Sequence, residues 1–186
     1  MNIRELEKKN TFQVAMMALI SGIYIILVYI FAPISWGILQ FRIAEIIMPF
    51  IIFLFNRKIG SIGISIGCFI ANMSYVSMLS VPILDLTLGT FSSFIVVFLS
   101  RTIYTKYIER QEDKIKKLLL QQLLLLFASF LMAFIVGLYL PVSIFGFFDL
   151  TFSLISILSI FISEAIIYNV FGYMLYKALE KAFNAL

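Results

Sequence analysis

The chain has 186 residues, of which 62% are hydrophobic and only 13% are charged, and its net charge at pH 7 is +4. A soluble domain usually carries about 25% charged residues, so this chain has too little polar surface to cover its apolar side chains in water. The composition excludes a water-soluble domain and indicates one all-α integral membrane domain over residues 1–186. A single cysteine and no histidine exclude an internal disulfide and predict no metal and no other cofactor.

Apolar stretches recur along the chain, each near the roughly 20 residues that a membrane-spanning helix needs. After a polar N-terminal segment, residues 1–11, six spans are predicted at residues 12–31, 43–55, 59–79, 86–107, 118–140 and 150–176. They must be helical, because a backbone in lipid has to satisfy its polar groups within its own segment. The second span is short and contains Pro49, which predicts a kinked or re-entrant helix.

The basic residues gather on one side of this six-helix bundle. All but one of the 14 Lys and Arg residues fall in the N-terminal segment, the second-to-third loop, the fourth-to-fifth loop or the C-terminus, and the exception is Arg42. The positive-inside rule places that side in the cytoplasm. We therefore expect a multi-pass protein of the cell membrane with both termini cytoplasmic and with no nucleic-acid partner. The mixed charges of residues 101–117 predict a solvated helical extension between spans four and five.

Two stripes of residues at helical spacing follow the third span. Small residues predict close packing against neighbouring helices: Gly60, Gly63, Gly67 and Ala71. Polar residues form the second stripe: Ser61, Ser65, Cys68 and Asn72. For the serines we expect hydrogen bonds between helices, whereas the amide of Asn72 needs several partners and is a candidate ligand.

Five charged residues remain outside the cytoplasmic segments: Arg42, Glu45, Asp85, Asp149 and Glu164. Four of them fall at the outer ends of spans or in outer loops, and Glu164 falls near the middle of the sixth span. A carboxylate at that depth costs about 3 kcal/mol or more, so a functional role is favoured. The alternatives are an ion pair with Arg42 or a carboxyl kept protonated by burial. Arg42 and Glu45 lie three residues apart and could also pair with each other.

Several kinds of chemistry are excluded by missing motifs. The sequence has no phosphate-binding loop, no Gly-x-Ser-x-Gly and no His-Glu-x-x-His, so no enzymatic activity is expected. The polar positions converge on the outer half of the bundle and do not line a continuous path, which disfavours a channel. They predict a cup of polar groups that opens outward and binds a small solute.

One segment carries a family resemblance. Residues 37–45, Gly-Ile-Leu-Gln-Phe-Arg-Ile-Ala-Glu, resemble the Gln-Phe-Arg-x-x-Glu signature of the QueT-type queuosine-precursor transporters. Three further stretches resemble elements of that family in the same order: Gly67-Cys68-x-x-Ala71-Asn72, Asp85-x-x-x-Gly89-Thr90, and Ser163-Glu164 with Gly172 and Tyr176. The resemblance covers essentially the whole chain. It departs from the family at Ser163, where Gly-Glu is common.

The resemblance implies a six-helix substrate-binding (S) component of an energy-coupling factor transporter. Such proteins bind a 7-deazaguanine from outside, and a coupling transmembrane subunit and two ATP-binding subunits complete the importer. Carried over by position, the implied substrate-binding residues are Gln40, Arg42, Glu45, Asn72, Asp85 and Glu164. Small residues of the first helix implied to contact the coupling subunit are Ala15, Ala18 and Gly22. Packing within the bundle is the alternative role for these three.

The residue types suit a guanine-like base. Its N–H and exocyclic NH₂ lie side by side, so one carboxylate, Glu45 or Glu164, could accept both. Its carbonyl needs a donor, for which the candidates are Gln40, Arg42 and Asn72. Candidate stacking partners are Trp36, Phe41 and Tyr75. The alternatives are an S component for another vitamin-like solute, a non-transport structural membrane protein and, third, a membrane enzyme.

Overall fold

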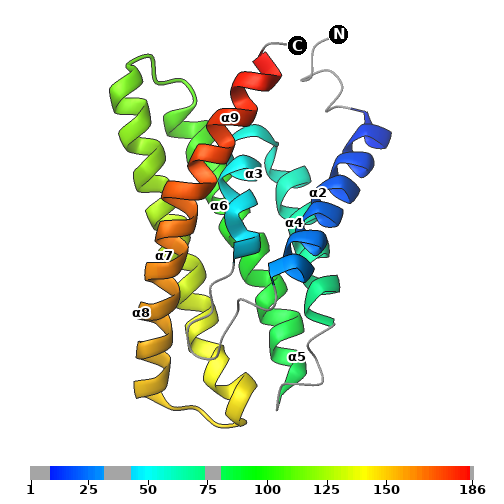
Figure 1. The fold of residues 1–186 in the computed structure, drawn as a ribbon, viewed down its shortest axis with the longest axis vertical. Helices are drawn as coiled ribbons and strands as arrows, with labels where there is room; N and C mark the ends of the chain where they lie inside the picture. The colour runs from blue at the N-terminus through cyan, green and yellow to red at the C-terminus, as the bar shows by residue number, and fades with distance from the viewer. Residues whose placement is uncertain (1–8, 32–42, 74–80, 185–186) are drawn as a thin grey trace.

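The computed structural model describes residues 9–31, 43–73 and 81–184. Within these residues the chain forms six helical segments and no strand (Figure 1). The first three segments are α2 (Asn10–Phe31), the 3₁₀ turn η2 (Ile43–Ile47) with α3 (Met48–Leu54), and α4 (Arg57–Met73). The fourth consists of α5 (Pro82–Leu84), η4 (Asp85–Gly89), α6 (Thr90–Ile103) and η5 (Tyr104–Ile108). The last two are α7 (Lys114–Phe145) and α8 (Leu150–Ile166) with η6 (Ile167–Gly172) and α9 (Tyr173–Asn184).

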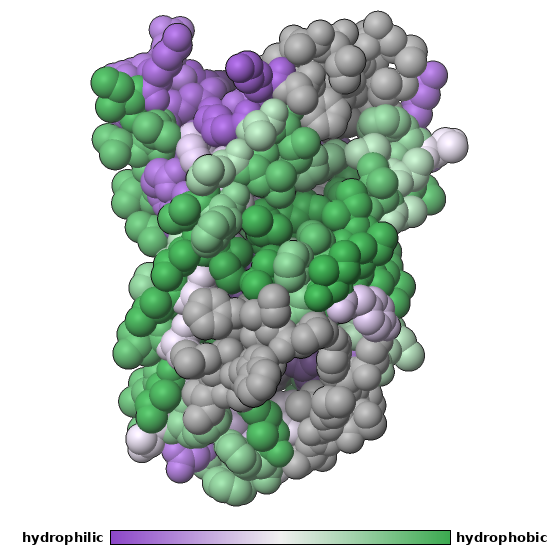
Figure 2. Space-filling model, in the orientation of Figure 1, coloured by the Kyte–Doolittle hydropathy of each residue, from purple (hydrophilic) through white to green (hydrophobic). Residues whose placement is uncertain are grey.

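Four of these segments are long and apolar enough to cross a membrane: Asn10–Phe31, Asp85–Ile108, Lys114–Phe145 and Leu150–Lys181. The segment Ile43–Leu54 is apolar but shorter. Large hydrophobic side chains form a belt across the middle of the face shown in Figure 2, and hydrophilic residues gather at the end where α9 ends. The prediction of a six-helix, all-α membrane protein is therefore confirmed. We call the end with Arg57, Arg110 and Lys177 the basic end.

Two prolines lie at informative positions in their helices. Pro49 lies in the first turn of α3, where the helix needs no backbone donor, and it marks the change from the 3₁₀ turn η2 to an α-helix within the short second span. Pro141 was expected in the outer loop, but α7 continues through it to Phe145 and ends at Gly146, whose φ of 78° favours glycine. The connection to α8 is therefore shorter than the sequence indicated.

The expected helical extension over residues 101–117 is interrupted. The helix ends at Ile108, and α7 begins only at Lys114. The Asp113 side chain caps α7 by accepting hydrogen bonds from the backbone N–H groups of Ile115 at 2.9 Å and Lys116 at 3.2 Å. Such a cap satisfies orphan donors at a helix start, which is why the chain separates into two helices here.

Small residues set the spacing between helices, as predicted for the third span. A Cβ added to Gly63 would lie 3.1 Å from Ile20, and one added to Gly67 would lie 3.1 Å from the backbone of Ser21, so α2 and α4 pack in close contact. The Ser21 hydroxyl also joins the two helices by donating a hydrogen bond to the Gly63 carbonyl at 2.7 Å. The antiparallel helices α7 and α8 meet in the same way at Gly137.

Candidate functional site

Glu45 lies at the centre of a polar cluster inside the bundle. Its side chain is 0% exposed, and it stands in the short η2–α3 segment, which begins midway along the bundle (Figure 1). The Tyr168 hydroxyl of η6 donates to Oε2 of Glu45 at 2.6 Å, and the Tyr24 hydroxyl of α2 lies 3.5 Å from Oε1. Three helical segments, far apart in sequence, therefore hold one carboxylate.

Glu164 belongs to the same cluster. It precedes Tyr168 by four residues along α8 and η6, is 0% exposed, and interacts electrostatically with the Tyr168 phenol. The structure thus places two of the predicted site residues, Glu45 and Glu164, near the same Tyr168 phenol. We call these two carboxylates with Tyr24 and Tyr168 the Glu45 cluster. The carboxylates of this cluster can accept hydrogen bonds from a ligand or pair with a positively charged group, because an ionised carboxylate carries hydrogen-bond acceptors only.

Asn72 and Asp85 meet in a second place. The Asn72 amide of α4 donates to the Asp85 backbone carbonyl at 3.2 Å, and the Tyr139 hydroxyl of α7 donates to Oδ1 of Asp85 at 3.1 Å. Gly89 leaves room for this arrangement, because an added Cβ would lie 2.9 Å from the Tyr139 hydroxyl and 3.0 Å from Asn72 Nδ2. We call Asn72, Asp85, Gly89 and Tyr139 the outer cluster. Its π-helical turn η4 adjoins α5 at the end of the bundle opposite the basic end (Figure 1).

Depth separates the two clusters in a way that the sequence did not indicate. Glu45 was expected near the outer mouth of the cup, but it is wholly buried, because its span is short and begins inside the bundle. Asp85 and Asn72, in contrast, are only half-buried. Asp149, at the start of α8, accepts a hydrogen bond from the backbone N–H of Phe152 at 2.7 Å and caps that helix.

The serine stripe on α4 makes contacts other than those predicted. The Ser61 hydroxyl donates to the Arg57 carbonyl, and the Ser65 hydroxyl donates to the Ser61 carbonyl. These are bonds within one helix, four residues back, and the expectation of hydrogen bonds between helices is wrong for both serines. These bonds form because, in a helix, the carbonyl four residues back lies within reach of a serine hydroxyl.

Several predicted residues lie outside the described part of the chain. They are Gln40 and Arg42, together with the proposed stacking partners Trp36, Phe41 and Tyr75. Their roles stay predictions. Sequence reasoning missed Tyr24, Tyr139 and Tyr168, of which only Tyr168 carried a signal, because it lies one helical turn after Glu164. Among the described residues, no group of three or more His, Cys, Asp or Glu side chains could hold a metal ion.

The small residues of α2 face outward. Ala15 and Ala18 are exposed, and a Cβ added to Gly22 would meet no atom within 4 Å. Ser21 faces the opposite way and packs on Gly63. Of these positions, only Ser21 is used for packing within the described bundle, so the outward three are available to another helix.

Comparison with known proteins gave one finding. The sequence model of the family described as QueT transporter matches residues 14–181. Neither the curated proteins nor the solved structures gave a match. The matched range contains every residue of the Glu45 cluster and the outer cluster.

Proposed function

Because the chain belongs to the QueT transporter family, we propose that it is the substrate-binding component of an energy-coupling factor importer. In this proposal it takes up a 7-deazaguanine precursor of queuosine or archaeosine. The family match and the apolar helices establish a multi-pass membrane transporter protein. The proposal adds the substrate, the partners and the orientation.

The observation that carries the proposal is the Glu45 cluster. A carboxylate with 0% exposure in the middle of a membrane protein is costly, and proteins retain such groups mainly at sites of function. The edge of a 7-deazaguanine offers two adjacent N–H donors, which a single carboxylate accepts as a pair of charge-assisted hydrogen bonds. The second carboxylate, Glu164, suits the ammonium of an aminomethyl substituent.

The remaining predicted contacts complete this proposal. Asn72 offers an amide and Asp85 a carboxylate from the outer cluster, while Gln40 and Arg42 offer donors for the carbonyl of the base. An S component for another vitamin-like solute is the second candidate, because the same fold can carry a different ligand. A purely structural role fits less well, since the family is one of transporters.

Glu45→Gln tests the site. An amide keeps the size of the side chain but has one acceptor atom and adds two donors, so we expect the affinity for 7-aminomethyl-7-deazaguanine to fall about ten- to a hundredfold. Titration calorimetry in detergent measures this. Asp149→Asn is the matched control, because it is also an acid-to-amide change, lies at an exposed position, and keeps a good N-cap.

The outcomes separate the alternatives. Equal affinity of wild type and Glu45→Gln removes Glu45 from the site. A variant that aggregates shows that Glu45 serves the fold, and Glu164→Gln then tests the proposal by the same titration. Tight binding of a different vitamin, with no binding of the deazaguanine, selects the second candidate.

The partners include a coupling transmembrane subunit and two ATP-binding subunits, with the outward residues Ala15, Ala18 and Gly22 as the contact on α2. Ala18→Leu and Gly22→Leu should spare ligand binding and abolish cellular uptake, because a larger side chain keeps a partner helix at a distance. Ala178→Leu, exposed on α9, is the control and should leave uptake intact. Loss of binding together with uptake contradicts the assignment.

The orientation follows from the same proposal. The basic end lies in the cytoplasm, since Lys and Arg collect on the cytoplasmic side of membrane proteins. Single-cysteine labelling in a Cys68-free background should reach position Lys114 from the cytoplasm and position Asp85 from outside. The reverse pattern contradicts it.

A further inference from the structure

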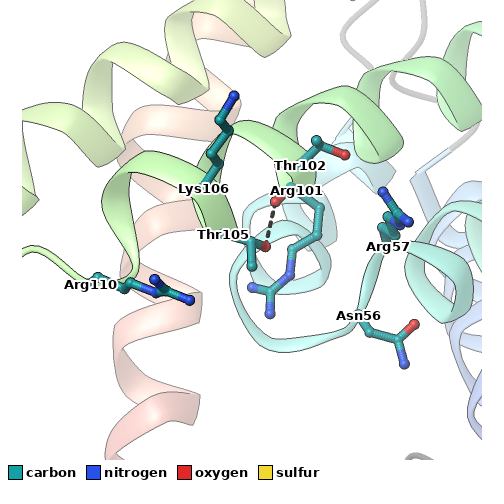
Figure 3. Close-up of a pocket in the computed structure, with 7 residues that line it drawn as sticks. All are labelled: Asn56, Arg57, Arg101, Thr102, Thr105, Lys106 and Arg110. Carbon is teal, nitrogen blue, oxygen red and sulfur yellow. Dashed lines mark hydrogen bonds between the residues drawn. The ribbon is translucent and has the colours of Figure 1, made fainter.

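A cavity at the basic end is built from cations. It is open, has a volume of about 460 Å³, and lies where the start of α4 faces the end of α6 and η5 (Figure 3). Four of its residues are basic: Arg57, Arg101, Lys106 and Arg110. Asn56 and two threonines complete the lining. We call this cavity the basic pocket.

Arg101 lines the basic pocket, and contacts with the protein hold its side chain in place. Its Nη1 donates to the carbonyls of Ile52 at 3.1 Å and Phe53 at 2.7 Å, so the guanidinium caps the end of α3. Its Nη2 lies 3.9 Å from Oε1 of Glu109. Only 12% of its side chain is exposed. The charge is therefore held in place whether or not a ligand is bound.

Among the described residues, the other three cations of the basic pocket have no carboxylate paired with them as Arg101 has. Arg57, Lys106 and Arg110 are exposed, and none of them forms an ion pair with a carboxylate of the described residues. Arg57 also stands at the first position of α4, where the helix dipole adds positive potential. The threonine hydroxyls already donate to carbonyls of their own helix and offer the pocket only acceptors. The three exposed cations therefore favour an anionic ligand.

An apolar surface continues from the basic pocket into the belt that faces lipid. The Arg57 guanidinium lies over the Phe98 ring, 5.4 Å from its centroid, and Phe98 stacks on Phe94 one turn further along α6 with centroids 5.7 Å apart. Leu99, on the same helix as the two rings, is 40% exposed, and Ile62 on the neighbouring α4 is 37% exposed. A molecule with an anionic head and an apolar tail matches both parts.

We propose that the basic pocket binds the phosphate of an anionic phospholipid from the leaflet at the basic end. One arginine guanidinium can donate two parallel hydrogen bonds to the oxygens of a phosphate. Basic pockets between helices on the cytoplasmic side are suited to lipid head groups. The acyl chains lie along Phe98 and Phe94. This site is separate from the Glu45 cluster, and the inference does not depend on the transported substrate.

Native mass spectrometry of the detergent-purified protein tests the inference. Dioleoyl phosphatidylglycerol and dioleoyl phosphatidylcholine, which share the same tails, are titrated separately, and we expect at least about tenfold tighter binding of the anionic lipid. The double variant Arg57→Gln and Arg110→Gln should lower that preference about tenfold or more, because each removed cation costs a charge-assisted contact. Lys114→Gln with Lys116→Gln is the matched control, since both lysines are exposed at the start of α7 and outside the pocket.

The outcomes are distinct. Equal binding of the two lipids, or equal losses in the pocket variant and in the control, overturns the inference. If inorganic phosphate at millimolar concentration displaces the lipid completely and binds alone as tightly, the site takes a free phosphate. If hexaglutamate peptide binds better than the lipid through the same two arginines, the occupant is an acidic protein segment. Retained monodispersity of both double variants in detergent keeps the comparison valid.

Discussion

The Glu45 cluster and the outer cluster each join a carboxylate to a tyrosine from a distant helix, yet they differ in depth. Glu45 is 0% exposed, and Tyr168 donates to it across 123 residues of sequence at 2.6 Å. Asp85 is half-buried, and Tyr139 donates to it at the longer distance of 3.1 Å. Burial therefore decides how much each carboxylate depends on its partners: water can replace a lost donor at Asp85 but not at Glu45.

Tyr168→Phe should produce the largest effect. Removing the hydroxyl deprives a wholly buried carboxylate of a charge-assisted hydrogen bond, so we expect the free energy of unfolding to fall by about 1.5–3 kcal/mol. Tyr139→Phe is the matched change in the outer cluster and should cost only about 0.5–1.5 kcal/mol. Unfolding in mixed micelles followed by circular dichroism measures both. Equal losses would remove the distinction between the clusters.

Asp85→Asn should change ligand affinity less than Glu45→Gln does. The amide oxygen can still accept from the Tyr139 hydroxyl, and the half-buried side chain can exchange contacts with water. We expect the affinity for 7-aminomethyl-7-deazaguanine to change at most about threefold, measured by calorimetry beside Glu45→Gln. If Asp85→Asn weakens binding as strongly as Glu45→Gln does, the outer cluster is a principal anchor and the depth comparison fails.

The helices and the polar residues could be predicted from sequence for a physical reason. In lipid each span must satisfy its own backbone, so long apolar stretches predict helices, and charged residues within them are conspicuous. Glu45 and Glu164 are buried in the described bundle, and Asn72 and Asp85 are half-buried. Gly63 and Gly67 pack against α2 as their spacing indicated.

The grouping of these residues could not be predicted in the same way. Whether Glu45 meets Glu164 or Asp85 depends on which faces of separate helices touch, and this information is not local to any span. The tyrosines were missed because a membrane protein uses tyrosine both at its interfaces and inside its core. The depth of Glu45 depends on where the short η2–α3 segment begins, which hydropathy does not fix.

The π-helical turn η6 divides the last transmembrane segment into an α8 half and an α9 half. An α-helix rotates by about 100° per residue, so the residue that a π turn adds offsets the side chains before it from those after it by about that angle. On α8 the buried face carries Ser156, Ser163 and Glu164, whereas beyond η6 Tyr176 is buried and packs at the basic end against Phe53. The half that carries Glu164 and the half at the basic end can therefore bury residues on different faces of one continuous segment.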